Sequence, residues 1–137
     1  MNATAAPVYQ RRGAEGSPYA LLNGGERYLH ETRDEALLAL LRRHGIERLD
    51  ELRILELGCG EGALLRSLLH YGAQERLIEG LDIDPARLAR ARVSLPDVPL
   101  AVASVDALPY RSESFDVAFA FTMFSSVLDP EARRMAA

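Results

Sequence analysis

Hydrophobic residues recur along the chain in two periods, one typical of helices and one of strands. Residues 26–44 carry apolar side chains at three- and four-residue spacing, namely Leu29, Ala36, Leu37, Leu40 and Leu41. This spacing predicts an amphipathic helix, and Gly45 is a suitable residue to end it. Residues 1–25 show neither period and contain Pro7 and Pro18, so they predict an arm or loop.

Short apolar runs follow, and helical patterns separate the first three of them. The runs predict strands over residues 53–57, 76–82, 100–104 and 115–121. The helical patterns cover residues 63–71, with a predicted buried face of Leu64, Leu65, Leu68 and Leu69, and a segment that starts at Asp84 and Pro85. Strands that alternate with helices pair in parallel through right-handed crossovers, which predicts an α/β fold with an open, doubly wound sheet.

Composition narrows the classes of protein. The chain has 137 residues, of which 48% are hydrophobic and 26% charged, as in an ordinary soluble domain. Its net charge of −4 offers no basic excess, so no nucleic-acid partner is expected. No apolar stretch approaches the ~20 residues that span a bilayer, so no membrane association is expected. The single cysteine, Cys59, excludes an internal disulfide and fits a cytoplasmic location.

A glycine-rich turn follows the first predicted strand, in the sequence ILELGCGEG at residues 54–62. Glycines at 58, 60 and 62 allow a sharp turn and let a ligand approach the bare backbone. The helix that follows offers free N–H groups and a partial positive charge. Together with Ala63 the turn also fits the loose dinucleotide pattern G-x-G-x-x-G/A, and a tight turn without any ligand is the alternative.

Acidic residues follow the second and third predicted strands. Asp82 lies 24 positions after Gly58, close to the offset of ~20 at which a carboxylate reaches ribose hydroxyls. Asp84 is a competing candidate, but a helix N-cap explains it better. Asp106 lies in a loop that opens on the same carboxyl edge of the sheet, where such folds bind ligands.

These segments resemble the motifs of class I S-adenosylmethionine-dependent methyltransferases, most closely the small-molecule "type 11" group. The matching stretches are ILELGCGEG, GLDIDP, VDALPYRSESFD and DVAFAF with its continuation TMFSSVLDPEARRMA. The resemblance runs from about residue 52 to residue 137. It implies a Rossmann-like fold and S-adenosyl-L-methionine as the cofactor.

The resemblance also implies roles on the methionine side of the cofactor. Glu56 would orient the ammonium group, and the backbone of Gly58, Cys59 and Gly60 would pass under the methionine moiety. Phe121, at the end of the fourth predicted strand, would line the sulfonium side. Glu56 further favours this cofactor over a nicotinamide dinucleotide, because a carboxylate there would repel a pyrophosphate and attract an ammonium.

On the nucleoside side, the resemblance assigns four residues. Asp82 would hold the ribose hydroxyls, and Ile83 would pack on the adenine. Asp106 would accept a hydrogen bond from the adenine amino group, and the N–H of Ala107 would face the ring. The segment around Tyr19, ahead of the first predicted helix, is either a flap over the cofactor or simply packed.

No catalytic residue and no metal ligand is predicted. Methyl transfer from a sulfonium depends mainly on in-line positioning, so no general base is obligatory. We interpret His30, His44 and His70 as surface or capping residues. His30-Glu31 lacks the second histidine of a zinc motif, and Cys59 has no expected nucleophilic role. Beyond the fourth predicted strand, Met123 and Phe124 could line an acceptor pocket or belong to the core.

The resemblance predicts a partial domain. Family members have sheets of order 3-2-1-4-5-7-6, whereas this sequence supplies 3-2-1-4, with the later strands missing. We therefore predict an N-terminal arm and capping helix over residues 1–47 and the N-terminal half of a methyltransferase domain over 48–137. The expected function is methyl transfer to a small-molecule or glycan acceptor. The alternative is a truncated cofactor-binding module without independent catalysis, and a homodimer or partner chain could pair with the edge of the fourth strand.

Overall fold

The computed structural model describes residues 24–121. Within this range the chain divides into two compact units, one on either side of the peptide bond between Glu47 and Arg48. None of the helices between residues 24 and 121 is long and apolar enough to cross a membrane.

The first unit contains the helix α2 (Gly24–Arg43), which confirms the predicted N-terminal helix. Gly45 ends it as expected: its φ is +68°, and the N–H of Ile46 donates to the carbonyl of Leu41 at 2.9 Å. The predicted apolar face is wrong in part. Leu37 and Leu41 are buried, whereas Leu40 is 40% exposed and Ala36 is also exposed. Ala36 and Leu40 each precede a buried leucine by one residue and so lie about 100° round the helix.

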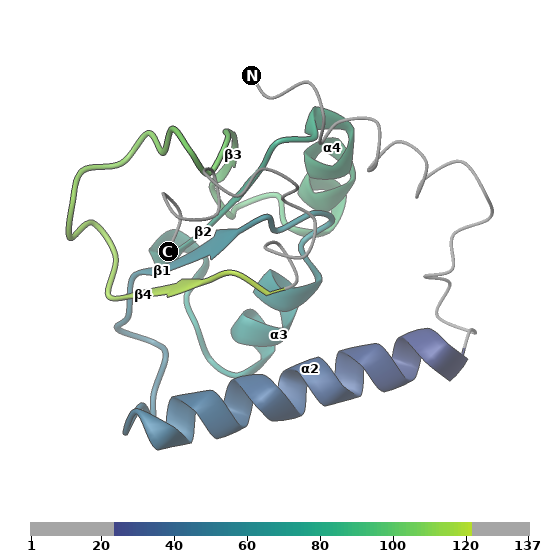
Figure 1. Cartoon of the computed structure of the whole chain (residues 1–137), viewed down its shortest axis with the longest axis vertical. Coiled ribbons are helices and arrows are strands. Elements are labelled where there is room, and N and C mark those ends of the chain that lie inside the picture. The colour runs from purple at the N-terminus through teal and green to yellow at the C-terminus, as the bar shows by residue number, and fades with distance from the viewer. Residues whose placement is uncertain (1–23, 122–137) are drawn as a thin grey trace. The chain divides into compact units, whose positions relative to one another are not determined.

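The second unit is built on a four-stranded parallel sheet of order β3-β2-β1-β4, as predicted (Figure 1). Its strands are β1 (Ile54–Leu57), β2 (Ile78–Asp82), β3 (Leu100–Val102) and β4 (Val117–Phe119). Ile54 of β1 pairs with Ile78 on one side and with Val117 on the other. Several strands are shorter than predicted. Residues 75–77 form a 3-10 turn, η1 (Glu75–Leu77), ahead of β2, and β4 ends two residues before Phe121.

Two helices, α3 (Ala63–His70) and α4 (Pro85–Ser94), lie against one face of this sheet. The buried side chains of α3 are Leu64, Leu65 and Leu68, while Leu69 is only half-buried, so the predicted face was one residue too wide. Gly62, the N-cap of α3, lies against the C-terminal end of α4. A Cβ atom on Gly62 would lie 2.4 Å from Cδ1 of Leu95, just after α4, and the glycine has a φ of +78°.

The opposite face of the sheet is covered by the loop between β3 and β4. Leu55, Leu57 and Leu81 form the buried cluster there, and the side chains packed against it are Ala101, Ala103, Val105, Tyr110, Phe115 and Ala120. The Tyr110 hydroxyl donates to Oε1 of Glu79 on β2 at 2.5 Å, and its ring meets Phe115 edge-on at 5.0 Å. Burial and this carboxylate raise the pKa of Tyr110. The loop that carries Asp106 is therefore anchored to β2.

A second anchor holds the start of β4 against β1. The N–H of Asp116 donates to the carbonyl of Arg53 at 2.8 Å, and the N–H of Arg53 donates to Oδ2 of Asp116 at 2.8 Å. Nη2 of Arg53 adds a charged hydrogen bond to Oδ1 of the same carboxylate at 2.9 Å. The Arg53 side chain and backbone lower the pKa of Asp116 to about 2.

We expect Asp116→Asn to destabilise the protein at neutral pH and to flatten the acid limb of its stability profile. Because the folded-state pKa of Asp116 lies below its unfolded value of about 4, its contribution is complete above pH 4 and is lost as the pH falls towards 2. Urea unfolding at several pH values between 7 and 2.5 measures this. Asp97→Asn, an exposed carboxylate in the turn after α4, is the control. Equal pH profiles for Asp116→Asn and the wild type would contradict the assignment.

Substitution of Gly62 tests the contact between α3 and Leu95. Gly72 also has a positive φ, +99°, but a Cβ there would meet nothing within 4 Å. Gly72→Ala should therefore lower the free energy of unfolding by the backbone cost alone, about 1–2 kcal/mol. Gly62→Ala should lose a further ~1–3 kcal/mol from overlap with Leu95. Thermal or urea unfolding compares the two variants, and equal losses would show that Leu95 moves aside freely.

Candidate functional site

The site begins at the turn between β1 and α3, where the chain runs through positive φ at alternate residues. Gly58 has a φ of +72° and Gly60 of +56°, conformations that L side chains rarely adopt. The turn is fixed to the neighbouring strand, because the N–H of Cys59 donates to the carbonyl of Leu81 at 2.9 Å. The predicted glycine turn is thus present, and it lies at the carboxyl end of β1.

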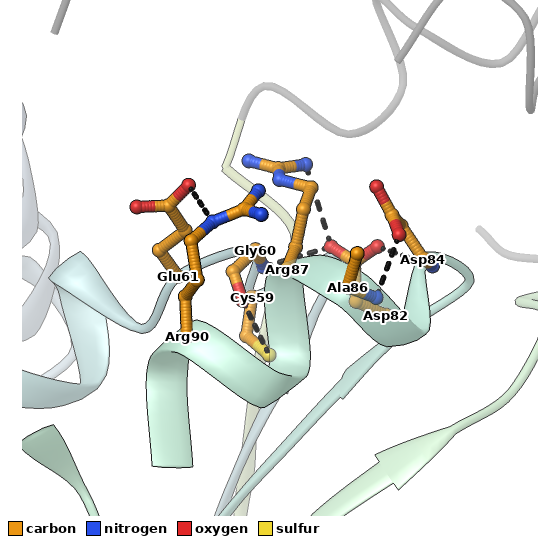
Figure 2. Close-up of polar contacts among 8 residues, drawn as sticks. All are labelled: Cys59, Gly60, Glu61, Asp82, Asp84, Ala86, Arg87 and Arg90. Atoms are coloured by element: carbon orange, nitrogen blue, oxygen red, sulfur yellow. Dashed lines mark hydrogen bonds and ion pairs between the residues drawn. The ribbon is translucent and has the colours of Figure 1, made fainter. Parts of the chain in front are cut away.

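Asp82 is the last residue of β2, and its side chain is buried beside this turn (Figure 2). Its Oδ2 accepts a hydrogen bond from the N–H of Gly60 at 2.7 Å, and its Oδ1 accepts one from the N–H of Asp84 at 2.9 Å. Nη1 of Arg87 lies 3.6 Å from Oδ2. One carboxylate therefore joins the glycine turn to the loop between β2 and α4. Asp82 and the glycine turn thus lie together at the carboxyl edge of the sheet.

Asp84 has the structural role that the sequence favoured. Its Oδ1 accepts a hydrogen bond from the N–H of Ala86 at 2.9 Å, and Pro85 occupies the first position of α4 (Figure 2). The side chain thus caps one of the N–H groups that a helix start leaves without a partner. Asp82 and Asp84 are two residues apart but have different roles: Asp82 joins the glycine turn to the loop after β2, and Asp84 caps α4.

A second buried carboxylate, Glu56, lies in β1 two residues before Gly58, with only 4% of its surface exposed. Burial raises the pKa of the neighbouring Cys59 thiol, and the charges of Glu56 and Asp82 raise it further. A thiol in this environment stays protonated and is a poor nucleophile. This agrees with the expectation that Cys59 serves through its backbone. It also shows that negative charge collects around the turn.

The remaining predicted residues lie at the same carboxyl edge of the sheet. Ile83 is half-buried directly after β2, and the N–H of Ala103, after β3, donates to the carbonyl of Asp82 at 3.1 Å. Asp106 and Ala107 are exposed in the loop beyond. The N–H of Ala107 donates to the carbonyl of Ser104 at 3.1 Å and so closes a turn in this loop.

Phe121 lies beyond the end of β4, not at the strand terminus as predicted. Its ring is half-buried, with its centroid 6.0 Å from that of Phe119. Met123, Phe124 and the segment around Tyr19 lie outside the described residues. His44 and His70 are exposed at helix ends, as expected. Between residues 24 and 121 no three His, Cys, Asp or Glu side chains are grouped so that they could hold a metal ion.

Sequence reasoning missed Arg87, which touches both Gly60 and Asp82. The available signal was electrostatic: Arg87 is the third residue of α4, and the N-terminal turn of a helix disfavours a cation. A basic residue there needs a carboxylate partner, and Asp82 provides it. One helical turn after Arg87, Nε of Arg90 donates to Oε1 of Glu61, which lies in the glycine turn, at 2.8 Å (Figure 2).

Comparison with known proteins supports the assignment of the fold. A family model described as a methyltransferase domain matches residues 54–137, which is more than half of the chain. An S-adenosylmethionine-dependent methyltransferase from Mesorhizobium loti is 36% identical over 63% of this chain and 37% of its own, with a TM-score of 0.53. None of the curated proteins compared with the chain matches it.

Two further structures share the fold over almost the whole chain. The PH0226 protein from Pyrococcus horikoshii OT3 is 23% identical over 93% of this chain and 57% of its own, with a TM-score of 0.67. The magnesium protoporphyrin IX methyltransferase of Synechocystis PCC 6803, solved with bound S-adenosylmethionine, is 20% identical over 98% of this chain and 64% of its own, with a TM-score of 0.65.

The chain therefore spans between about one third and two thirds of the length of these three structures. S-adenosylmethionine, the predicted cofactor, is the cofactor of the family whose model matches. The sheet order, the glycine turn and the family match agree with one another. This chain belongs to the methyltransferase domain family, the class I S-adenosylmethionine-dependent methyltransferases of Rossmann-like fold.

Proposed function

We propose that this chain binds S-adenosylmethionine at the carboxyl edge of its sheet, as part of an enzyme that methylates a small-molecule or glycan acceptor. The observation that carries the proposal is the buried carboxylate of Asp82, which is held against the bare backbone of Gly60. A nucleoside needs both features at one place: an acceptor for its hydroxyls and a surface without side chains along which the rest of the cofactor can lie.

The hydrogen-bonding capacity of Asp82 fits a ribose. An ionised carboxylate has about four acceptor positions. The N–H groups of Gly60 and Asp84 use one position on each oxygen. One position on each oxygen is then left for the 2′- and 3′-hydroxyls. The two backbone bonds also fix the orientation of the carboxylate before the ligand arrives, so little side-chain entropy is lost on binding.

The charge of Glu56 favours the methionine end over a pyrophosphate. Its carboxylate is buried in β1, directly ahead of the glycine turn. A ligand ammonium near this position would gain from the charge, whereas a dinucleotide would bring two phosphates towards it. This is the reason to prefer S-adenosylmethionine although the turn also fits the loose dinucleotide pattern.

The bound cofactor would supply an activated methyl group on its sulfonium. The contribution of the protein is then to position the cofactor: Asp82 for the ribose, Glu56 for the ammonium, and Ile83 for the adenine. The loop anchored by Tyr110 would bring Asp106 to the adenine amino group. None of these groups has to take up a proton, so cofactor binding should depend on geometry and charge more than on pH.

The acceptor class is inferred from charge and from the names of similar structures. A net charge of −4 does not favour a nucleic-acid acceptor. Among the similar structures, one is named as an amino pentose methyltransferase from Micromonospora echinaspora and one as a magnesium protoporphyrin IX methyltransferase. Both names describe small-molecule acceptors, which supports the same class here.

Isothermal titration with S-adenosylhomocysteine tests the binding site. We expect Asp82→Ala to weaken binding by about 10- to 100-fold, since it removes charged hydrogen bonds worth roughly 1.5–3 kcal/mol. Asp84→Asn is the matched control, because asparagine also caps helices and should leave affinity and stability almost unchanged. Circular dichroism should confirm that each variant is folded. Affinity of Asp82→Ala within twofold of the wild type, or binding of NAD in place of S-adenosylhomocysteine, would contradict the proposal.

A further inference from the structure

Arg87 has a position that the fold alone does not explain. As the third residue of α4, it brings a positive charge to the positive end of the helix dipole. Its side chain is 30% exposed, so it could extend into water. Instead it turns towards the glycine turn and the buried carboxylate of Asp82 (Figure 2).

The guanidinium lies directly on the backbone of Gly60. A Cβ atom built on Gly60 would be 2.3 Å from Nη2 and 2.7 Å from Cζ of Arg87. On its other side, Nη1 lies 3.6 Å from Oδ2 of Asp82. Arg87 therefore contacts the two groups that the proposed function assigns to the cofactor, the bare glycine surface and the ribose carboxylate.

The guanidinium lies where a nucleoside bound to Gly60 and Asp82 would also have to lie. Oδ2 of Asp82 already accepts the N–H of Gly60, and Arg87 lies beside this oxygen. A ribose hydroxyl that took the remaining acceptor position of Oδ2 would approach the same oxygen as the cation. The carboxylate of Glu61, at the other end of the turn, is already paired with Arg90. The side chain of Arg87 is long and 30% exposed, so it can extend into solvent when it leaves Asp82.

We propose that Arg87 competes with the ribose of the cofactor for Asp82 and thereby lowers the affinity of the site. The inference rests on the proposed function and adds a residue that determines how tightly the cofactor is held. In the free protein Arg87 compensates the charge of Asp82 and covers Gly60. In the bound protein the hydroxyls take its place, and the ion pair is lost. The apparent affinity falls with the population of the closed arrangement.

Titration of the full chain with S-adenosylhomocysteine, using variants of one helix, tests this competition. Arg87→Ala removes both the charge and the side chain that lies over Gly60. Arg87→Met keeps an unbranched side chain of similar length without the charge. Arg90→Ala is the matched control, because Arg90 lies one turn later and pairs with a carboxylate outside the ribose site. We expect about three- to tenfold tighter binding for Arg87→Ala, an intermediate gain for Arg87→Met, and no change for Arg90→Ala.

Salt gives an independent measurement. Raising NaCl from about 50 to 500 mM should improve binding to the wild type by about twofold relative to Arg87→Ala, because screening weakens the ion pair of Arg87 only in the wild type. The effect of salt on the attraction between Glu56 and the ligand ammonium is common to both proteins. Weaker or unchanged binding by both Arg87 variants, with the wild type still binding, would overturn the competition and leave the proposed function intact. If no variant and no wild-type protein bound the ligand, the proposed function would fail and this inference with it.

Discussion

The site depends on one buried carboxylate, which accepts hydrogen bonds from two backbone N–H groups. Asp82 ends β2, Gly60 lies in the turn after β1, and Asp84 caps the start of α4. Without the carboxylate, the buried N–H of Gly60 would lose its acceptor, which costs about 1–3 kcal/mol, and the part-buried N–H of Asp84 would lose its acceptor at a smaller cost. The interaction therefore shapes the edge of the sheet whether or not a ligand is present. A ligand meets an acceptor whose direction is already set.

The parallel sheet is what brings these groups together. Parallel strands end at one edge, so residues more than twenty positions apart in sequence meet after β1 and β2. The two anchors at Arg53–Asp116 and Tyr110–Glu79 hold the remaining strand and loop against the same core. They use charged and hydroxyl groups near the surface, where the short strands β3 and β4 contribute few ladder hydrogen bonds. The candidate site is defined by the position of its residues at the carboxyl edge of the sheet, rather than by any single motif.

Features set by backbone conformation and by period could be predicted from the sequence. The glycines and the cap at Asp84 follow from local chemistry, and the parallel pairing follows from the handedness of crossovers. The strand order came from the resemblance to the methyltransferase family. Strand ends and helix faces were less certain. Phe121 lies beyond the end of β4, and Leu40 is exposed. An apolar residue next to a buried one has the same hydrophobic character, but its side chain points to another side of the element. Arg87 was missed because no spacing rule encodes where a flexible side chain folds back, although its charge in the first turn of α4 indicated that it needs a carboxylate partner.

The missing side chain at Gly60 has two uses, and this limits what its substitution can reveal. Its φ of +56° favours glycine on backbone grounds, and its empty side leaves room for the Arg87 guanidinium. A nucleoside would need the same room. A larger residue at 60 would therefore disturb the turn, the arginine and the ligand at once, and a loss of binding could not be assigned to any of them. Arg87 differs, because its side chain can be shortened without altering the backbone of the turn. The competition for Asp82 is therefore best tested by substitutions of Arg87 in α4, because only the side chain of Arg87 makes the contact.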